Sequence, residues 1–264
     1  MKKILALLLI SIVFISTGCQ KKVEKTVVEK IQEKGILTVG VKTDSKPFGF
    51  LDENGNNVGF DIDIAKAVSQ DILGNERRIK YVSVSPNSRI EDITSEKVDI
   101  VVATMTVIPQ REYLIQFSKP YYVAGQTALV RDDSDIYTFA DLRKKTTIVV
   151  LGTTAEQNIR RIIPTAKIVG YKTYEDAFNA FLNEEGDAIS TDDTILLGFL
   201  QDYPDDYRIL KNRISKELYA VGMKQQENDD SLKQCVDGVI TRMTKNGSLR
   251  ELKTKWNLDQ SMRI

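Results

Sequence analysis

Polar residues that could together hold a small charged molecule stand just past the ends of short apolar runs in this chain. Such runs are expected to be buried strands, and ligands of open α/β sheets bind at the carboxyl ends of strands. The candidates are one ammonium, one guanidinium, one carboxylate and several hydroxyls: Lys42, Thr104, Thr106, Arg111, Thr153, Thr154 and Asp192. A guanidinium suits a carboxylate and a carboxylate suits an ammonium, so this set matches a zwitterion.

Each candidate also has a purely structural explanation. Arg111 could be an ordinary surface arginine, because most arginines are exposed. Thr153 and Thr154 could cap a helix, and Asp192 could do the same. Capping and ligand binding are compatible, since the free amides at a helix start bind anions. Lys42 either extends to solvent or faces a negative charge, and the sequence leaves both possibilities open.

The residue types that the chain lacks favour binding over catalysis. It contains no histidine, which excludes a Ser-His-Asp or Cys-His mechanism and a histidine-based zinc site. It also has no glycine-rich phosphate loop or dinucleotide fingerprint. We therefore expect no catalytic residue, no metal and no cofactor.

The N-terminus predicts export. A pair of lysines precedes an apolar run at residues 4–15, which is too short to span a bilayer, and Ser16-Thr17-Gly18-Cys19 follows. This arrangement resembles a bacterial lipoprotein signal over residues 1–18, with Cys19 as the lipidated first residue of the mature chain. Ser16 departs from the usual leucine, and an ordinary secretory signal that happens to contain a cysteine is the alternative.

The predicted mature chain is nearly neutral. Removing residues 1–18 takes away two lysines and no acidic residue, which leaves 35 Lys and Arg against 37 Asp and Glu. Nothing in this balance indicates nucleic acid or an anionic membrane surface as a partner. Only Cys19 and Cys235 remain, so an acylated Cys19 would leave no disulfide. Residues 19–34 are expected to form a charged tether that runs into a first helical turn.

Short apolar runs alternate with amphipathic segments from Gly35 onward, which is the pattern of an α/β protein. The strands that this pattern predicts are Ile36–Val41, Val98–Met105, Thr146–Leu151 and Asp187–Thr191. The predicted helices are Asp61–Leu73, a helix from Gly152-Thr153-Thr154 to about Ile163, Thr173–Leu182, and two near Leu232–Met243 and Leu249–Trp256.

Several segments together resemble the extracytoplasmic amino-acid-binding proteins of ABC importers, the polar-amino-acid type called family 3. They are Pro47-Phe48 with the run from Val58 to Ala65, Val98 to Arg111, Phe117 to Tyr122, Gly186-Asp187-Ala188 leading to Asp192, and Lys255-Trp256. The resemblance implies a type II periplasmic-binding-protein fold, with two α/β lobes joined by a two-segment hinge. Lobe 1 would comprise 35–124 and 220–258, lobe 2 would comprise 125–219, and 259–264 would be a tail. Phe60, Phe117, Tyr121 and Trp256 are expected to pack lobe 1.

The same resemblance implies roles for the candidates. The ligand's α-carboxylate would bind Thr104 through its backbone, with Thr106, Arg111, Thr154 and the adjacent Thr153. The α-ammonium would bind Thr104 and Asp192. The ligand's side chain would meet Lys42, Arg89 and Tyr174, and two cations there match acidic-amino-acid members of the family. Alternatively, Lys42 and Arg89 point to solvent, or Arg89 pairs with Glu91 or Asp92. Ser45 stands where many members carry an aromatic ring.

These observations predict a monomeric, lipid-anchored receptor on the outside of the cell membrane, or a periplasmic one. It would bind L-glutamate or L-aspartate between two closing lobes and deliver the ligand to an ABC permease. The alternatives are the same kind of receptor for glutamine, cystine or another polar amino acid, and a dehydratase-like enzyme of the same fold. A dehydratase should lack the amine-binding aspartate, and this chain retains Asp192.

Overall fold

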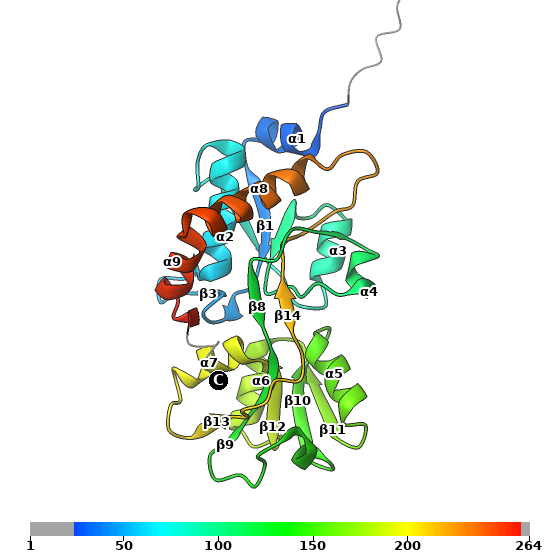
Figure 1. Cartoon of the computed structure of the whole chain (residues 1–264), viewed down its shortest axis with the longest axis vertical. Coiled ribbons are helices and arrows are strands. Elements are labelled where there is room, and N and C mark those ends of the chain that lie inside the picture. The colour runs from blue at the N-terminus through cyan, green and yellow to red at the C-terminus, as the bar shows by residue number, and fades with distance from the viewer. Residues whose placement is uncertain (1–23, 260–264) are drawn as a thin grey trace, which may run out of the picture.

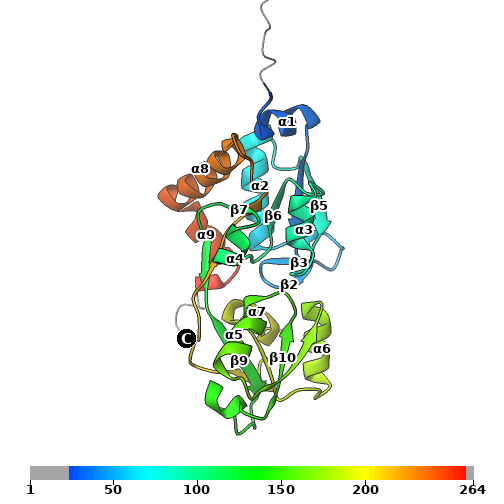
Figure 2. The same ribbon diagram turned by 90° about the vertical axis from the view of Figure 1, so that its right-hand side faces the viewer.

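The computed structural model describes residues 24–259, and the predicted signal segment, Cys19 and residues 260–264 lie outside this range. Two lobes are stacked along the long axis of the molecule (Figures 1 and 2). We define the first lobe as residues 24–121 and 220–259, and the second lobe as residues 125–216. Between them run β8 (Tyr122–Ala124) and β14 (Glu217–Tyr219), which pair antiparallel. The domain boundaries expected from the sequence fall at the ends of these two strands.

The first lobe is built on a five-stranded mixed sheet. Strand β1 is parallel to both of its neighbours, and β15 runs antiparallel between β6 and β7. In sheet order the strands are β5 (Ile79–Ser83), β1 (Leu37–Val41), β6 (Ile100–Val102), β15 (Gly222–Met223) and β7 (Gln116–Phe117). A small sheet at the edge that faces the second lobe contains β2 (Asp44–Ser45), β3 (Gly49–Leu51) and β4 (Asn57–Val58). The helices are α1 (Val27–Lys34), α2 (Phe60–Leu73), α3 (Arg89–Thr94), α4 (Pro109–Glu112), α8 (Ser231–Asn246) and α9 (Ser248–Lys255).

The second lobe repeats this plan with different connections. Its sheet contains β11 (Lys167–Tyr171), β10 (Thr146–Val150), β12 (Ala188–Asp192), β9 (Gln126–Arg131) and β13 (Tyr207–Ile209). Its helices are η1 (Phe139–Leu142), α5 (Thr154–Ile162), α6 (Tyr174–Leu182) and α7 (Asp193–Leu200). Strands β10, β11 and β12 are parallel, so their carboxyl ends share one edge. Apolar clusters cover both faces of this sheet.

Two sequence expectations differ from the structure. The strand expected over Val98–Met105 is only Ile100–Val102, because Thr104 adopts a left-handed backbone with φ of 46° and turns the chain. The tether expected over residues 19–34 is shorter, since α1 begins after a capping box at Thr26 and buries Ile31 in the core of the first lobe. Within residues 24–259, every helix is too short or too polar to cross a membrane.

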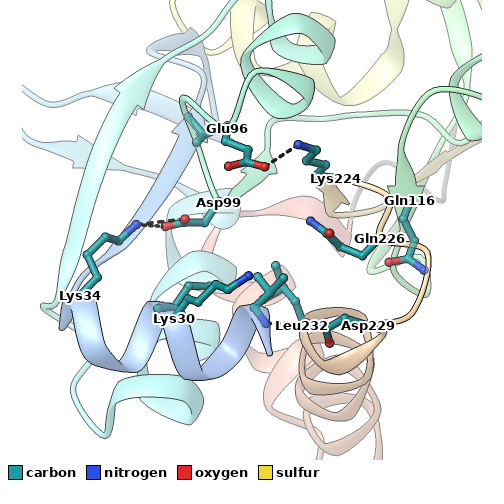
Figure 3. Close-up of a pocket in the computed structure, with 12 residues that line it drawn as sticks. Lys30, Lys34, Glu96, Asp99, Gln116, Lys224, Gln226, Asp229 and Leu232 are labelled. Carbon is teal, nitrogen blue, oxygen red and sulfur yellow. Dashed lines mark hydrogen bonds and ion pairs between the residues drawn. The ribbon is translucent and has the colours of Figure 1, made fainter. Parts of the chain in front are cut away.

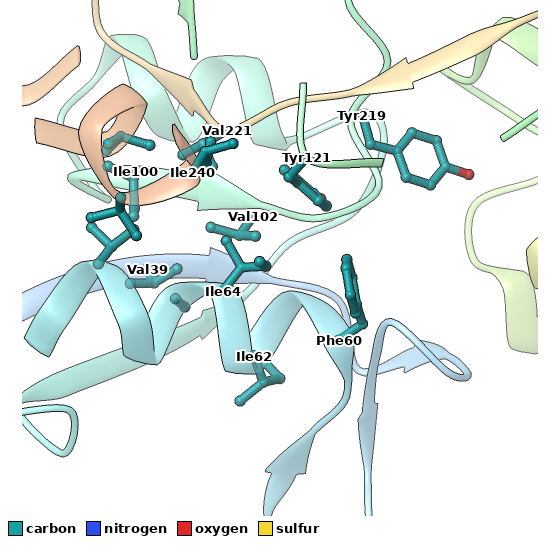
Figure 4. Packing of buried hydrophobic residues seen from close by; sticks show 14 of the residues in the cluster. Val39, Phe60, Ile62, Ile64, Ile100, Val102, Tyr121, Tyr219, Val221 and Ile240 are labelled. Carbon is teal, nitrogen blue, oxygen red and sulfur yellow. The ribbon is translucent and has the colours of Figure 1, made fainter. Parts of the chain in front are cut away.

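The core of the first lobe reaches the lobe boundary through aromatic rings (Figure 4). Phe60 is fully buried and meets Phe48 and Tyr122 edge to face, with ring centroids 5.8 Å away in both cases. Tyr219 packs its ring on Phe48 at 5.4 Å, while its hydroxyl points away from the cluster. Phe117 and Tyr121 are buried and Trp256 is partly buried against the cluster, which confirms their predicted packing role.

This packing predicts a large stability loss for Phe60→Ala. Truncating a buried phenylalanine in a well-packed core removes about 3–5 kcal/mol of the free energy of unfolding. Tyr113 is 85% exposed, so Tyr113→Ala should change it by less than about 0.5 kcal/mol. Urea unfolding followed by circular dichroism measures both variants. Equal losses for the two would show that Phe60 does not anchor this core.

Candidate functional site

A small cavity lies between the two lobes and takes its lining from both. The first lobe contributes Pro86, Arg89, Thr104, Thr106 and Arg111, and the second contributes Thr153, Thr154, Ala155, Tyr174, Thr191 and Asp192. All of the ligand-binding candidates named from the sequence are in this set except Lys42. The structure therefore brings together groups from segments nearly ninety positions apart in the chain, from Thr104 to Asp192.

A second depression lies at the opposite end of the first lobe, where α1, α8 and the turn after α3 meet (Figure 3). Its lining includes three lysines, but two of them already have counter-charges. Lys34 lies 2.7 Å from Asp99, and Lys224 pairs with Glu96. Compensated charges at an exposed surface leave little demand for a charged ligand. The inter-lobe cavity, with its buried cations, is the candidate site.

Arg111 is positioned by α4 and reaches across the lobe boundary. Its Nη1 donates to the Thr106 carbonyl at 2.8 Å, and its Nη2 donates to the Gly152 carbonyl of the second lobe at 3.1 Å. Burial lowers the pKa of Arg111, while the charges of Glu217 and Asp192 oppose that shift. Arg111 is thus a buried cation rather than a surface arginine.

The start of α5 faces Arg111 across the cavity. Thr153 occupies the N-cap position, but its hydroxyl donates to the Val150 carbonyl at 2.6 Å. Its side chain therefore caps none of the first amides of α5 within the described chain. Thr154 is the first helical residue, and its hydroxyl also lines the cavity. A guanidinium opposite uncapped helix amides is an arrangement that binds a carboxylate.

Glu217 is a functional candidate that the sequence reasoning missed. It lies in β14, is 2% exposed, and accepts a hydrogen bond from the Thr154 hydroxyl at 2.9 Å. Ser215 donates to its other oxygen. The sequence around it, Lys216-Glu217-Leu218, is that of an ordinary solvated strand. Only the crossing of β14 between the lobes buries this carboxylate beside Thr154.

Asp192 ends β12 and stands before the first residue of α7. Its carboxylate accepts a hydrogen bond from the Tyr219 hydroxyl and caps none of the α7 amides within the described chain. Burial, together with the negative charges of Glu217 and Asp193, raises the pKa of Asp192 to about 8. The empty site therefore holds a carboxyl group that a cation would convert to its ionised form.

Thr104 is held in its left-handed conformation by Asp61. The Thr104 N–H donates to Asp61 Oδ2 at 2.8 Å, and the Tyr121 hydroxyl donates to Asp61 Oδ1 at 2.8 Å. Burial raises the pKa of Asp61 to about 6, and these two hydrogen bonds oppose the rise. The sequence gives no sign of this role for Asp61, because an acidic residue in the first turn of a helix is common.

Arg89 begins α3 and is 3% exposed. Its Nη1 donates to the Ala103 carbonyl at 2.7 Å, and its Nε has no hydrogen-bond partner within residues 24–259. Burial, and after it the charge of Arg111, lowers the pKa of Arg89 to about 9, so the group stays charged at neutral pH. Exposure does not hold for Arg89, because the side chain is buried. Within residues 24–259 it also forms no ion pair with Glu91 or Asp92, and Asp92 pairs with Lys97 at 2.7 Å instead.

Lys42 differs from its predicted role as a free cation for the ligand. Its ammonium is buried, lies 2.9 Å from Asp44 Oδ1, and stands 3.9 Å from the ring centroid of Tyr174. The contact with Asp44 is an ion pair without the geometry of a hydrogen bond. Burial lowers the pKa of Lys42 to about 8, and Asp44 opposes the fall. The lysine that follows β1 thus faces a carboxylate of its own chain and contacts the ring of Tyr174, which lines the cavity, while Lys42 does not.

Comparisons with known proteins agree with this architecture. A glutamine-binding protein of Geobacillus stearothermophilus is 38% identical over 75% of this chain and 76% of its own length. The ABC transporter glutamine-binding protein GlnH of Bacillus subtilis is 32% identical over 97% of both chains. The crystal structure of a cysteine-binding protein from Campylobacter jejuni superposes with a TM-score of 0.83 at 32% identity, covering 88% of this chain and 93% of the other.

The fold is the type II periplasmic-binding-protein fold that the resemblance implied. The family profile described as bacterial extracellular solute-binding proteins, family 3, matches residues 37–259, which include the second lobe, the first lobe from β1 onward and every residue that lines the cavity. The chain belongs to this family of solute-binding proteins.

Proposed function

We propose that this protein is the receptor of an ABC importer for a polar amino acid, which it binds between its lobes and delivers to a membrane permease. The main observation behind this proposal is that one small cavity has groups suited to a carboxylate at one end and a group suited to an ammonium at the other. Arg111 and the uncapped start of α5 form the first, and Asp192 forms the second. Relatives named for glutamine support an amino acid as the ligand.

The α-carboxylate would lie between Arg111 and the first amides of α5, near the hydroxyls of Thr106, Thr153 and Thr154. The α-ammonium would pair with Asp192 and approach the backbone at Thr104. Because Arg111 and Asp192 belong to different lobes, a bound amino acid would bridge them and favour their closure. Glu217 orients Thr154 in this scheme through its 2.9 Å hydrogen bond.

The side-chain end favours L-glutamine over an acidic ligand. Lys42 and Asp44 form an ion pair, so Arg89 is the cation that lines this end of the cavity. Asp61 adds a second carboxylate to the group. An amide carbonyl could accept from Arg89 without adding a buried negative charge.

L-Glutamate and L-aspartate, the ligands expected from the sequence, form the second candidate. The specific observation in their favour is the unpartnered Nε of Arg89, which a carboxylate would satisfy. We propose no chemical reaction at the site, since Asp192 suits an ammonium rather than the dienol of a dehydratase. Anchoring through Cys19 and a monomeric state complete the proposal.

Titration calorimetry against a panel of amino acids tests this function. We expect tight binding of L-glutamine, weaker binding of L-glutamate and L-aspartate, and no binding of L-arginine, which Arg89 would repel. Asp192→Ala should weaken every ligand, by about 2–5 kcal/mol, because the ammonium is common to all. Asp205→Ala, an exposed carboxylate of the same lobe, is the control. Selective loss of one ligand in Asp192→Ala would instead place this residue at the side-chain end.

The raised pKa of Asp192 also predicts how affinity depends on pH. Below about pH 8 the Asp192 carboxyl is protonated before a ligand binds. A bound ammonium requires the ionised carboxylate, so binding releases a proton. Affinity should therefore rise between pH 6.5 and 8, by up to about tenfold per pH unit, and level off above. Calorimetry in buffers of different ionisation enthalpy measures the released proton. A flat profile, or an unchanged slope in Asp192→Asn, would contradict this assignment.

A further inference from the structure

We propose that Asp44 is a specificity-determining residue, because its charge cancels that of Lys42 and leaves the side-chain end of the cavity suited to a neutral amide. This inference rests on the proposed function. It assigns the choice between glutamine and glutamate to a residue that does not line the cavity.

Both oxygens of Asp44 are engaged within the protein. Oδ1 faces the Lys42 ammonium at 2.9 Å and accepts from the Ser45 hydroxyl at 3.0 Å. Oδ2 accepts from the backbone N–H of Tyr174 at 2.9 Å, at the first residue of α6 in the other lobe. A carboxylate held in this way is fixed in position and in charge. The charge of Lys42, together with hydrogen bonds from the Tyr174 N–H and the Ser45 hydroxyl, holds the pKa of Asp44 below its ordinary value despite burial.

Tyr174 connects this ion pair to the site. One face of its ring lies over the Lys42 ammonium, and the residue lines the cavity. Its hydroxyl is within hydrogen-bond distance of the Thr191 hydroxyl, at 2.9 Å, and the Lys42 ammonium lies 3.9 Å from the centroid of its ring. Charges separated from a ligand by a single buried ring act on it strongly, because little water screens them.

Lys42 interacts electrostatically with three other ionisable groups at this end, Asp44, Arg89 and Asp61. Lys42 and Arg89 are positive, and Asp44 and Asp61 are negative when ionised. The sum is zero, which suits the amide of glutamine. Removing the charge of Asp44 leaves one positive charge in excess, which would attract the side-chain carboxylate of glutamate. Removing the charge of Lys42 leaves one negative charge in excess, which would repel it.

Asp44 also bridges the lobes, so a purely structural role must be separated from a charge role. Losing the contact with Tyr174 would weaken the association of the two lobes. The affinity for every ligand would then fall to the same extent. Changing the charge would instead alter the ratio of the dissociation constants for glutamate and glutamine. The sign of that change must be opposite for Asp44 and Lys42 variants, which no loss of a lobe contact would produce.

The experiment measures that ratio by titration calorimetry for the wild type, Asp44→Asn, Lys42→Met and the double variant. Asparagine keeps an oxygen that can accept from the Tyr174 N–H. We expect Asp44→Asn to shift the ratio toward glutamate by about 10- to 100-fold, and Lys42→Met to shift it away from glutamate by a similar factor. The double variant, neutral again, should return to within about threefold of the wild type.

Asp202→Asn is the matched control. Asp202 is an acidic residue of the second lobe that contacts Lys46 of the first lobe at 3.1 Å, but both side chains are about half exposed. Its loss removes an inter-lobe ion pair without changing the buried charge, so the ratio should stay constant. Thermal unfolding without ligand checks that each variant is folded. If Asp44→Asn does not fold, Lys42→Met and the double variant still decide the sign.

The outcomes separate the two proposals. A wild type that binds glutamine, with an Asp44→Asn variant that weakens both ligands equally, would overturn the specificity role of Asp44 and leave the receptor function intact. Shifts of the same sign in Asp44→Asn and Lys42→Met would overturn it as well. A wild type that binds neither glutamine nor glutamate would overturn the proposed ligand and this inference with it.

Discussion

The compensation of buried charge where the two lobes meet is the constraint on which the site depends. An ion removed from water is costly by several kcal/mol unless a partner or a pKa shift compensates it. The structure uses both routes, with Lys42 paired to Asp44 and the pKa of Asp192 raised so that it can be neutral. Arg89 and Arg111 donate hydrogen bonds to backbone carbonyls, which carry only partial charges. Their remaining N–H donors are what the site offers to an anionic or polar ligand.

The two lobes contribute different charged groups to the site. The first lobe supplies the guanidinium groups of Arg89 and Arg111, and the second supplies Asp192 and the start of α5. Contacts that need no ligand already cross the boundary, from Arg111 to the Gly152 carbonyl and from Asp44 to the Tyr174 N–H. The arrangement of the lobes in this structure is therefore partly supported by the protein itself, and a ligand that bridges Arg111 and Asp192 would stabilise it further. A ligand that binds one arrangement of the lobes more tightly raises the population of that arrangement, which is the form that a partner would recognise.

Backbone strain contributes at one position of the site. Thr104 adopts a positive φ, which is unfavourable for a β-branched residue. The buried hydrogen bond from its N–H to Asp61, and the one from Tyr121 to the same carboxylate, hold that turn in place. The turn ends β6 early and brings Thr104 and Thr106 to the cavity wall. The conformation of the strand end, and not only the residue types beyond it, shapes the site.

Much of the fold could be predicted from local patterns. Helix α2 was expected within one residue of its observed start, because its apolar spacing and Gly74 are local signals. The rule that ligands bind at strand ends led to Thr104, Arg111, Thr154 and Asp192, all of which line the cavity. Helix periodicity and strand ends both depend on the spacing of residues along the chain, which can be read directly from the sequence.

By itself, then, the sequence determined the α/β class, the positions of the main elements and the types of charged group that gather at the cavity. Only the tertiary structure decided which charges meet. It paired Lys42 with Asp44, placed Asp61 against Thr104, and buried Glu217 beside Thr154. The physical reason is that the energy of an ion depends on its burial and on the charges within a few ångströms. Both are properties of the folded arrangement of distant segments, and the order of residues does not encode them locally.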